Sequence, residues 1–146
     1  MNQNQILLEA MKEYGLTELP GSGNPKIVQM SKDLGYPFNS DKDNWCGIFV
    51  ATCVTRSGGA IPDKAYSARN WLKWGNPVTE PQTGDIVVFW RVAKDSWQGH
   101  VAIFISYADS RKEYVNVLGG NQGNKVCIAP YDAAHILGFR RVSSQV

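Results

Sequence analysis

The spacing of apolar residues changes at Thr83-Gly84-Asp85, and this change constrains the fold of the chain more than any other feature. Before it, apolar residues recur at helical spacing, which predicts helices over residues 5–14, 25–34, 46–58 and 64–74. After it, short apolar runs rich in β-branched and aromatic residues predict strands over 86–90, 101–108, 113–118, 125–128 and 136–142. The sequence therefore predicts an α+β fold, with N-terminal helices packed on an antiparallel β-sheet of about five strands.

Length and composition favour one globular domain over residues 1–146, with 43% hydrophobic and 19% charged residues. A net charge of +2 is too small to indicate a nucleic-acid partner. No apolar run approaches the ~18 residues of a membrane span. The N-terminal residues lack the cationic start and apolar stretch of a signal peptide, so we expect synthesis in the cytoplasm.

The three cysteines, Cys46, Cys53 and Cys127, form too sparse a set for a disulfide framework. The chain has no Cys-x-x-Cys pair and no closely spaced histidines, so we expect no metal site. Cys53 and Cys127 fit the usual role of a buried cysteine, which is that of a small apolar residue. Cys46 differs because it stands where a predicted helix begins.

Cys46 and His100 together suggest thiolate chemistry. A helix N-terminus stabilises a sulfur anion, and His100 in Gly99-His100-Val101 stands at the start of a predicted strand, where it can exchange a proton with the sulfur. A lone cysteine and a lone histidine are more often structural, but their order and placement favour a catalytic pair. His135 fits the structural role.

The hairpin between the second and third predicted strands offers a third residue for the catalytic group of Cys46 and His100. A four-residue loop over 109–112 would place Ala108 opposite Glu113 and His100 opposite Asn121, about 5 Å apart. Asn121 would then orient the imidazole, as the third residue does in cysteine proteases. A loop one residue longer or shorter would give this role to Gln122 or another residue.

The same register pairs Ala102 with Gly119, and two such small residues leave room for the helix of Cys46 to approach the sheet. Tryptophans pack in cores by default, which suits Trp71 and Trp74. Trp45, next to Cys46, and Trp97, in the polar loop before His100, are candidates for the walls of a substrate cleft. Asn44 and Gln122 are further candidates for contacts with the substrate.

Four segments in this order resemble the CHAP and NlpC-type peptidoglycan hydrolases. They are Asn44-Trp45-Cys46-Gly47-Ile48-Phe49-Val50, Gly84-Asp85-Ile86-Val87-Val88-Phe89, Gly99-His100-Val101 and Val117-Leu118-Gly119-Gly120-Asn121-Gln122. Glu18-Leu19-Pro20-Gly21 and Asn24-Pro25 further resemble single-domain members associated with phages and effectors.

The resemblance implies a papain-like cysteine peptidase or amidase that needs no cofactor. Its substrate would be an amide bond in the peptide of the bacterial cell wall or at its junction with the sugar. Cys46 would be the nucleophile, His100 the general base and acid, and Asn121 the polar third residue, with Gln122 as its substitute. Some CHAP proteins carry an acidic residue near this strand end, where this chain has Gly119 and Gly120. The oxyanion would be bound by the Cys46 N–H and by Asn44.

We expect such a protein to act as a monomer on the cell wall after release or injection. Its partners would be an immunity protein, a holin or a secretion apparatus. Two alternatives remain at this stage. The chain could be a papain-like protease or deamidase acting on protein, or a non-catalytic module that binds wall fragments.

Overall fold

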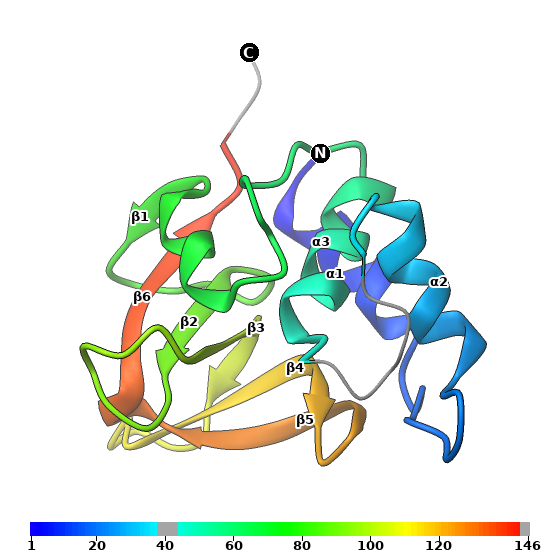
Figure 1. The fold of residues 1–146 in the computed structure, drawn as a ribbon. Coiled ribbons are helices and arrows are strands. Elements are labelled where there is room, and N and C mark those ends of the chain that lie inside the picture. The colour runs from blue at the N-terminus through cyan, green and yellow to red at the C-terminus, as the bar shows by residue number, and fades with distance from the viewer. Residues whose placement is uncertain (38–43, 144–146) are drawn as a thin grey trace.

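Three helices gather on one side of a single sheet in the computed structural model, which describes residues 1–37 and 44–143 (Figure 1). They are α1 (Gln3–Met11), α2 (Pro25–Asp33) and α3 (Cys46–Arg56). A 3-10 helix, η1 (Ala68–Lys73), follows where the sequence predicted a longer helix over 64–74. The predicted α+β class, with helices packed on an antiparallel sheet, is confirmed.

The sheet has six strands in the order β1-β6-β2-β3-β4-β5, and all its neighbours are antiparallel. The strands are β1 (Asn76–Val78), β2 (Ile86–Trp90), β3 (Gly99–Tyr107), β4 (Tyr114–Gln122), β5 (Lys125–Asp132) and β6 (Ile136–Arg141), with the short 3-10 helix η2 (Ala133–His135) before β6. The short β1 was not predicted, because its sequence, Asn-Pro-Val, has no strand pattern. β4 and β5 continue past their predicted ends.

The ends of the first two helices follow their sequences. Asn2 and Gln5 form a reciprocal capping box at the start of α1, and Asn24 caps α2 ahead of Pro25 at its first position. The N-cap of α3 is Trp45, whose side chain makes no capping hydrogen bond. The first backbone N–H groups of α3 are therefore left for other partners.

Helix α3 is the centre of the larger hydrophobic core, and all its residues from Cys46 to Val54 are buried. It contacts α1 and α2 on one side and β3 and β4 on the other. Two glycines permit this packing. A Cβ at Gly47 would meet the carbonyl oxygens of Ala65 and Tyr66, and one at Gly120 would lie 2.6 Å from the Trp45 ring.

The opposite face of the sheet carries a second cluster, which includes Phe89, Ala102, Phe104 and Phe139. His100 lies on this face, because side chains two residues apart on a strand point the same way. The two faces are thus packed separately, and a residue at the start of α3 can approach the second face at the start of β3.

A buried ion pair fixes the start of β2. Asp85 is 1% exposed and accepts from Arg141 Nε at 2.9 Å and from Arg141 Nη2 at 2.8 Å. The same carboxylate accepts from the backbone N–H of Gln82 at 2.7 Å. Gly84-Asp85 thus has a structural role, which is to join the turn before β2 to β6.

Replacing Gly47 with alanine tests the close packing of α3. Helix propensity alone predicts that Gly47→Ala stabilises the fold by about 1 kcal/mol. Because the added Cβ meets backbone carbonyls, which cannot rotate away as a side chain could, we expect a net destabilisation of about 1–3 kcal/mol. Urea unfolding of both proteins measures the difference, and a variant more stable than the parent would contradict this packing.

Candidate active site

Cys46 lies at the first position of α3 and is fully buried. Its sulfur lies beside the backbone N–H of Val101, the residue that follows His100, and beside the N–H of Gly47 in the uncapped first turn of α3. The described residues include no hydrogen bond between Cys46 and His100 themselves. The predicted cysteine and histidine therefore meet at one place in the fold, through the backbone of Val101.

Burial raises the pKa of the Cys46 thiol, and this effect outweighs the backbone N–H groups of Val101 and Gly47 and the charge of Arg91, which all lower it. The sequence predicted the opposite balance, in which the helix N-terminus favours the thiolate. That prediction is wrong for this structure, because the sulfur is removed from water. The resting group is a neutral thiol.

His100, the second residue of β3, is 2% exposed and has one hydrogen-bonding side-chain partner, Gln122, with 2.9 Å between Nε2 and Oε1. The amide nitrogen of Gln122 donates to the carbonyl oxygens of Val117, at 3.3 Å, and Cys127, at 2.7 Å. Since both amide hydrogens are used, Oε1 must accept, and His100 carries its proton on Nε2. Nδ1 is left as the unprotonated nitrogen, which can act as a base.

Burial also lowers the pKa of His100 to about 4, and the hydrogen bond that His100 donates to Gln122 opposes this shift only in part. The Tyr131 ring stacks on the imidazole, with centroids 4.9 Å apart and planes 12° apart, and Phe89 lies at 6.1 Å. The pKa of Tyr131 itself is raised to about 12, mainly by burial. The imidazole is thus neutral at pH 7 and packed against the Tyr131 ring.

The structure gives Asn121 a different contact from the predicted one. Its Nδ2 donates to Oδ1 of Asn44 at 2.9 Å, and it is Gln122 that bonds His100. The cause is an irregularity between Gly119 and Gln122 in the pairing of β4 with β5, where Asn121 takes a left-handed φ of 60°. This kink turns Asn121 outward and Gln122 inward, so the expected contact between Asn121 and His100 is wrong.

The predicted register is correct at Ile103 and Phe104 but wrong at the hairpin end. Ile103 pairs with Leu118 as expected, whereas Tyr107 pairs with Val115, because β3 has an irregularity between Phe104 and Ser106. Ala108 bonds to Tyr114 rather than facing Glu113.

The sequence suggested that α3 approaches the sheet at Ala102 and Gly119, but α3 does not occupy this space. The Gln122 side chain fills it, because a Cβ at Gly119 would lie 2.6 Å from Gln122 Oε1. α3 approaches one residue further along β4, at Gly120. Gln122 is 3% exposed, so the predicted contact between Gln122 and the substrate is not available in this structure.

The two tryptophans proposed as cleft walls have different surroundings. Trp45 is 1% exposed and its Nε1 donates to Glu18 at 2.9 Å, so it belongs to the core and forms no wall. Burial of α3 against the sheet explains this difference from the prediction. Trp97 is 80% exposed in the loop between β2 and β3.

Two hollows flank Arg91 and Val92 next to the cysteine–histidine pair. The first, which we call the Trp97 hollow, has a volume of about 310 Å³ and is lined by Asn44, Arg91, Val92, Trp97, Gln98, Gly99 and Asn121. The second, the His100 hollow, has about 270 Å³ and is lined by Phe89, Trp90, Arg91, Val92, His100, Tyr131, Asp132 and His135. Sequence reasoning missed Arg91 and Tyr131, which no motif marks.

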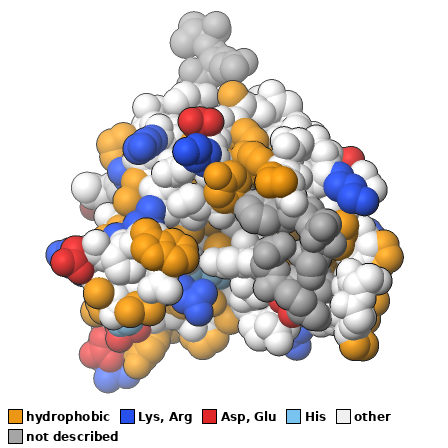
Figure 2. Space-filling view, in the orientation of Figure 1, with side chains coloured by type: hydrophobic (Ala, Val, Ile, Leu, Met, Phe, Trp, Pro, Cys, Tyr) orange, Lys and Arg blue, Asp and Glu red, His pale blue; other side chains and the backbone are white. Residues whose placement is uncertain are grey.

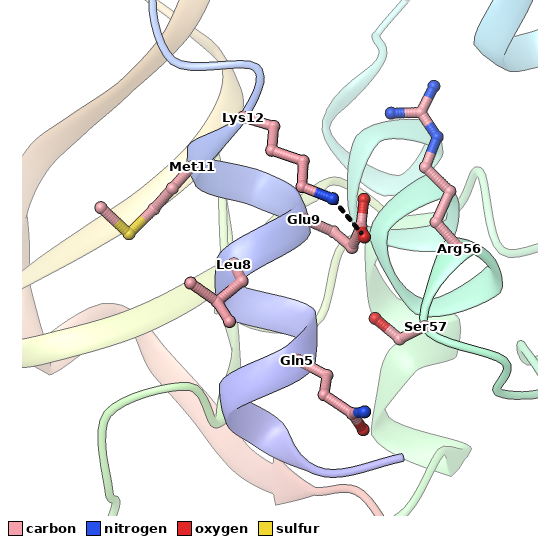
Figure 3. A pocket seen from close by; sticks show the side chains of 7 residues that line it. All are labelled: Gln5, Leu8, Glu9, Met11, Lys12, Arg56 and Ser57. Atoms are coloured by element: carbon pink, nitrogen blue, oxygen red, sulfur yellow. Dashed lines mark hydrogen bonds and ion pairs between the residues drawn. The ribbon is translucent and has the colours of Figure 1, made fainter.

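A larger hollow of about 540 Å³ lies elsewhere, between α1 and the end of α3 (Figure 3). Its lining includes the ion pair of Lys12 with Glu9, at 2.9 Å, together with Leu8 and Met11. Its described lining has no nucleophile paired with a base, in contrast to the place where Cys46 and His100 meet. In Figure 2, basic and acidic side chains lie dispersed among hydrophobic ones over the described part of the face shown.

The sequence profile of the CHAP domain matches residues 36–121, which is more than half of the chain. The chain therefore belongs to the CHAP family, whose members are cysteine- and histidine-dependent amidohydrolases and peptidases acting on peptidoglycan. A search of curated proteins found no significant match. The match includes Cys46 and His100 but ends one residue before Gln122. Association with phages or effectors stays a prediction.

No helix in the described ranges, 1–37 and 44–143, combines the length and the apolar character needed to cross a membrane.

The lowered pKa of His100 makes stability depend on pH. In the unfolded chain His100 binds a proton below about pH 6.5, and in the folded chain only near pH 4. The stability that depends on a neutral imidazole is therefore present above pH 6.5 and is lost as the pH falls toward 4. We expect the free energy of unfolding of the parent to fall, relative to that of His100→Asn, by about 3 kcal/mol between pH 6.5 and pH 4.

Urea unfolding at several pH values measures this difference, and an NMR titration of the assigned His100 ring gives its pKa directly. A difference that stays constant between pH 4 and 6.5, or a ring that titrates near 6.5, would contradict the buried neutral imidazole.

Proposed function

We propose that this chain hydrolyses an amide bond in the peptide stem or cross-bridge of peptidoglycan, with Cys46 as nucleophile and His100 as general base and acid. One observation carries the proposal. The sulfur at the start of α3 lies beside the N–H that follows His100, and Gln122 leaves the imidazole with Nδ1 as its free basic nitrogen.

The reaction starts from a neutral thiol and a neutral imidazole. His100 Nδ1 takes the proton of Cys46 as Sγ attacks the carbonyl carbon of the scissile amide, and a C–S bond forms. His100 then gives this proton to the amide nitrogen, the C–N bond breaks, and the amine leaves. Water then attacks the thioester carbon while His100 Nδ1 takes a proton from the water, and the C–S bond breaks as His100 returns this proton to the sulfur. The acid is released, and Cys46 recovers its proton.

The oxyanion formed on attack needs donors at the start of α3. The N–H of Cys46 belongs to the uncapped first turn, where the backbone donors have no partner within the helix. Asn44 is our second donor. Because its Oδ1 already accepts from Asn121, the amide nitrogen of Asn44 is the group left to donate.

Removing either member of the pair tests the function. We expect Cys46→Ala and His100→Ala to lower the rate of sacculus digestion at least ~10³-fold, because each variant lacks the nucleophile or its base. Cys53→Ala is the matched control, since Cys53 lies two turns along the same helix and outside the site. Circular dichroism shows whether the variants fold.

Mass spectrometry of the digested sacculi identifies the new amine and carboxyl ends and hence the bond. Lysis retained by folded Cys46→Ala would overturn the mechanism. Intact sacculi together with a cleaved or deamidated protein substrate would favour the alternative of a protease or deamidase.

A second prediction separates the two candidates for the third residue. Gln122→Ala removes the acceptor that holds the His100 proton on Nε2, so we expect kcat to fall about 100-fold. Asn121→Ala removes only the contact with Asn44 and should lower kcat less. A larger loss in Asn121→Ala than in Gln122→Ala would show that Asn121 orients the histidine during turnover.

A further inference from the structure

Arg91 stands between the two hollows of the site and lines both. It directly follows β2, whose neighbour β3 carries His100. Its positive charge lies close enough to lower the pKa of both Cys46 and His100. A cation at this place can reach a substrate that lies across the cysteine–histidine pair.

The guanidinium groups of Arg69 and Arg91 differ in their contacts. The Arg69 guanidinium donates to the carbonyl oxygens of Gln98, Lys94 and Ala93, at 2.9, 2.8 and 3.0 Å. Within the described parts of the chain, the Arg91 guanidinium makes no hydrogen bond or ion pair. Arg69 therefore holds the loop, and Arg91 is available to a ligand.

The backbone around Arg91 is nevertheless rigidly held. Ala93 N–H donates to the Arg91 carbonyl at 2.7 Å, and Arg91 N–H donates to Gln98 at 3.2 Å. Between them Val92 has a φ of 67°, which is strained for a β-branched residue and typical of a classic γ-turn. Strain kept by surrounding contacts is a feature of ligand sites, where it fixes a side chain in advance.

The chemistry of the two hollows decides what Arg91 binds. The His100 hollow contains the carboxylate of Asp132, which already caps the N–H of Ala134 at 2.9 Å. Among the described residues that line the Trp97 hollow, none is acidic and Arg91 is the one cation. The amides of Asn44, Gln98 and Asn121 and the exposed ring of Trp97 complete it. An anionic, hydrogen-bonding group fits this hollow.

We infer that Arg91 is a specificity residue, which binds a free carboxylate of the substrate in the Trp97 hollow, next to the scissile amide. The inference rests on the proposed function, since stem peptides of peptidoglycan carry free carboxylates. A guanidinium recognises a carboxylate through two parallel N–H···O bonds, and a carboxamide cannot accept both.

Two synthetic stem peptides that differ only in this group, carboxylate or carboxamide, test the inference. We expect the parent to prefer the carboxylate peptide at least tenfold in kcat/KM, and Arg91→Gln to lose most of this preference. Arg111→Gln is the control, because Arg111 lies in the hairpin of β3 and β4, is 72% exposed and pairs with Asp109. It should keep the preference.

Binding of both peptides to Cys46→Ala, with and without Arg91→Gln, is measured by calorimetry in parallel. Tighter binding of the carboxylate peptide that is lost in Arg91→Gln supports the inference, even if neither peptide is hydrolysed. The absence of hydrolysis would count against the proposed function alone. Hydrolysis with a preference that survives Arg91→Gln, or with equal losses on both peptides, would overturn the inference and leave the proposed function standing.

Discussion

The close packing of α3 against the sheet is the constraint on which the site depends. Glycine at position 47 lets the chain at Ala65 and Tyr66 pass beside the helix, and Gly120 lets β4 lie under Trp45. Gly47 directly follows Cys46, and Gly120 packs against Trp45, which directly precedes Cys46. The start of α3 is therefore held at the start of β3, where the sulfur reaches the backbone next to His100.

This packing also determines the protonation state of the pair. Burial raises the pKa of Cys46 and lowers that of His100 to about 4, so a thiolate–imidazolium pair is disfavoured at rest. Gln122 is neutral and favours imidazolium less than a carboxylate at this position would. We infer that the proton moves during attack, when the substrate carbonyl and the N–H donors of α3 share the developing charge.

The sequence predicted the fold class, the start of α3 at Cys46 and the strand of His100, because periodicity and residue type report local structure well. It failed where local geometry departs from a regular strand. The left-handed φ of Asn121 exchanged the expected contacts of Asn121 and Gln122. Asparagine adopts this conformation more readily than most residues, but the strand pattern does not show which asparagine does so. Burial of Trp45 and the availability of Arg91 depend on packing between distant segments, which spacing along the chain does not reveal.

The most direct test of the mechanism is to trap the acyl-enzyme. An ester analogue of the stem peptide, chosen so that acylation outruns hydrolysis, is mixed with the protein, quenched in acid and examined by peptide mass spectrometry. The account predicts a thioester on Cys46, formed in a burst equal to the enzyme concentration and absent from His100→Ala on the same time scale. Turnover of the analogue with Cys46 unmodified, or with the acyl group on another residue, would contradict it.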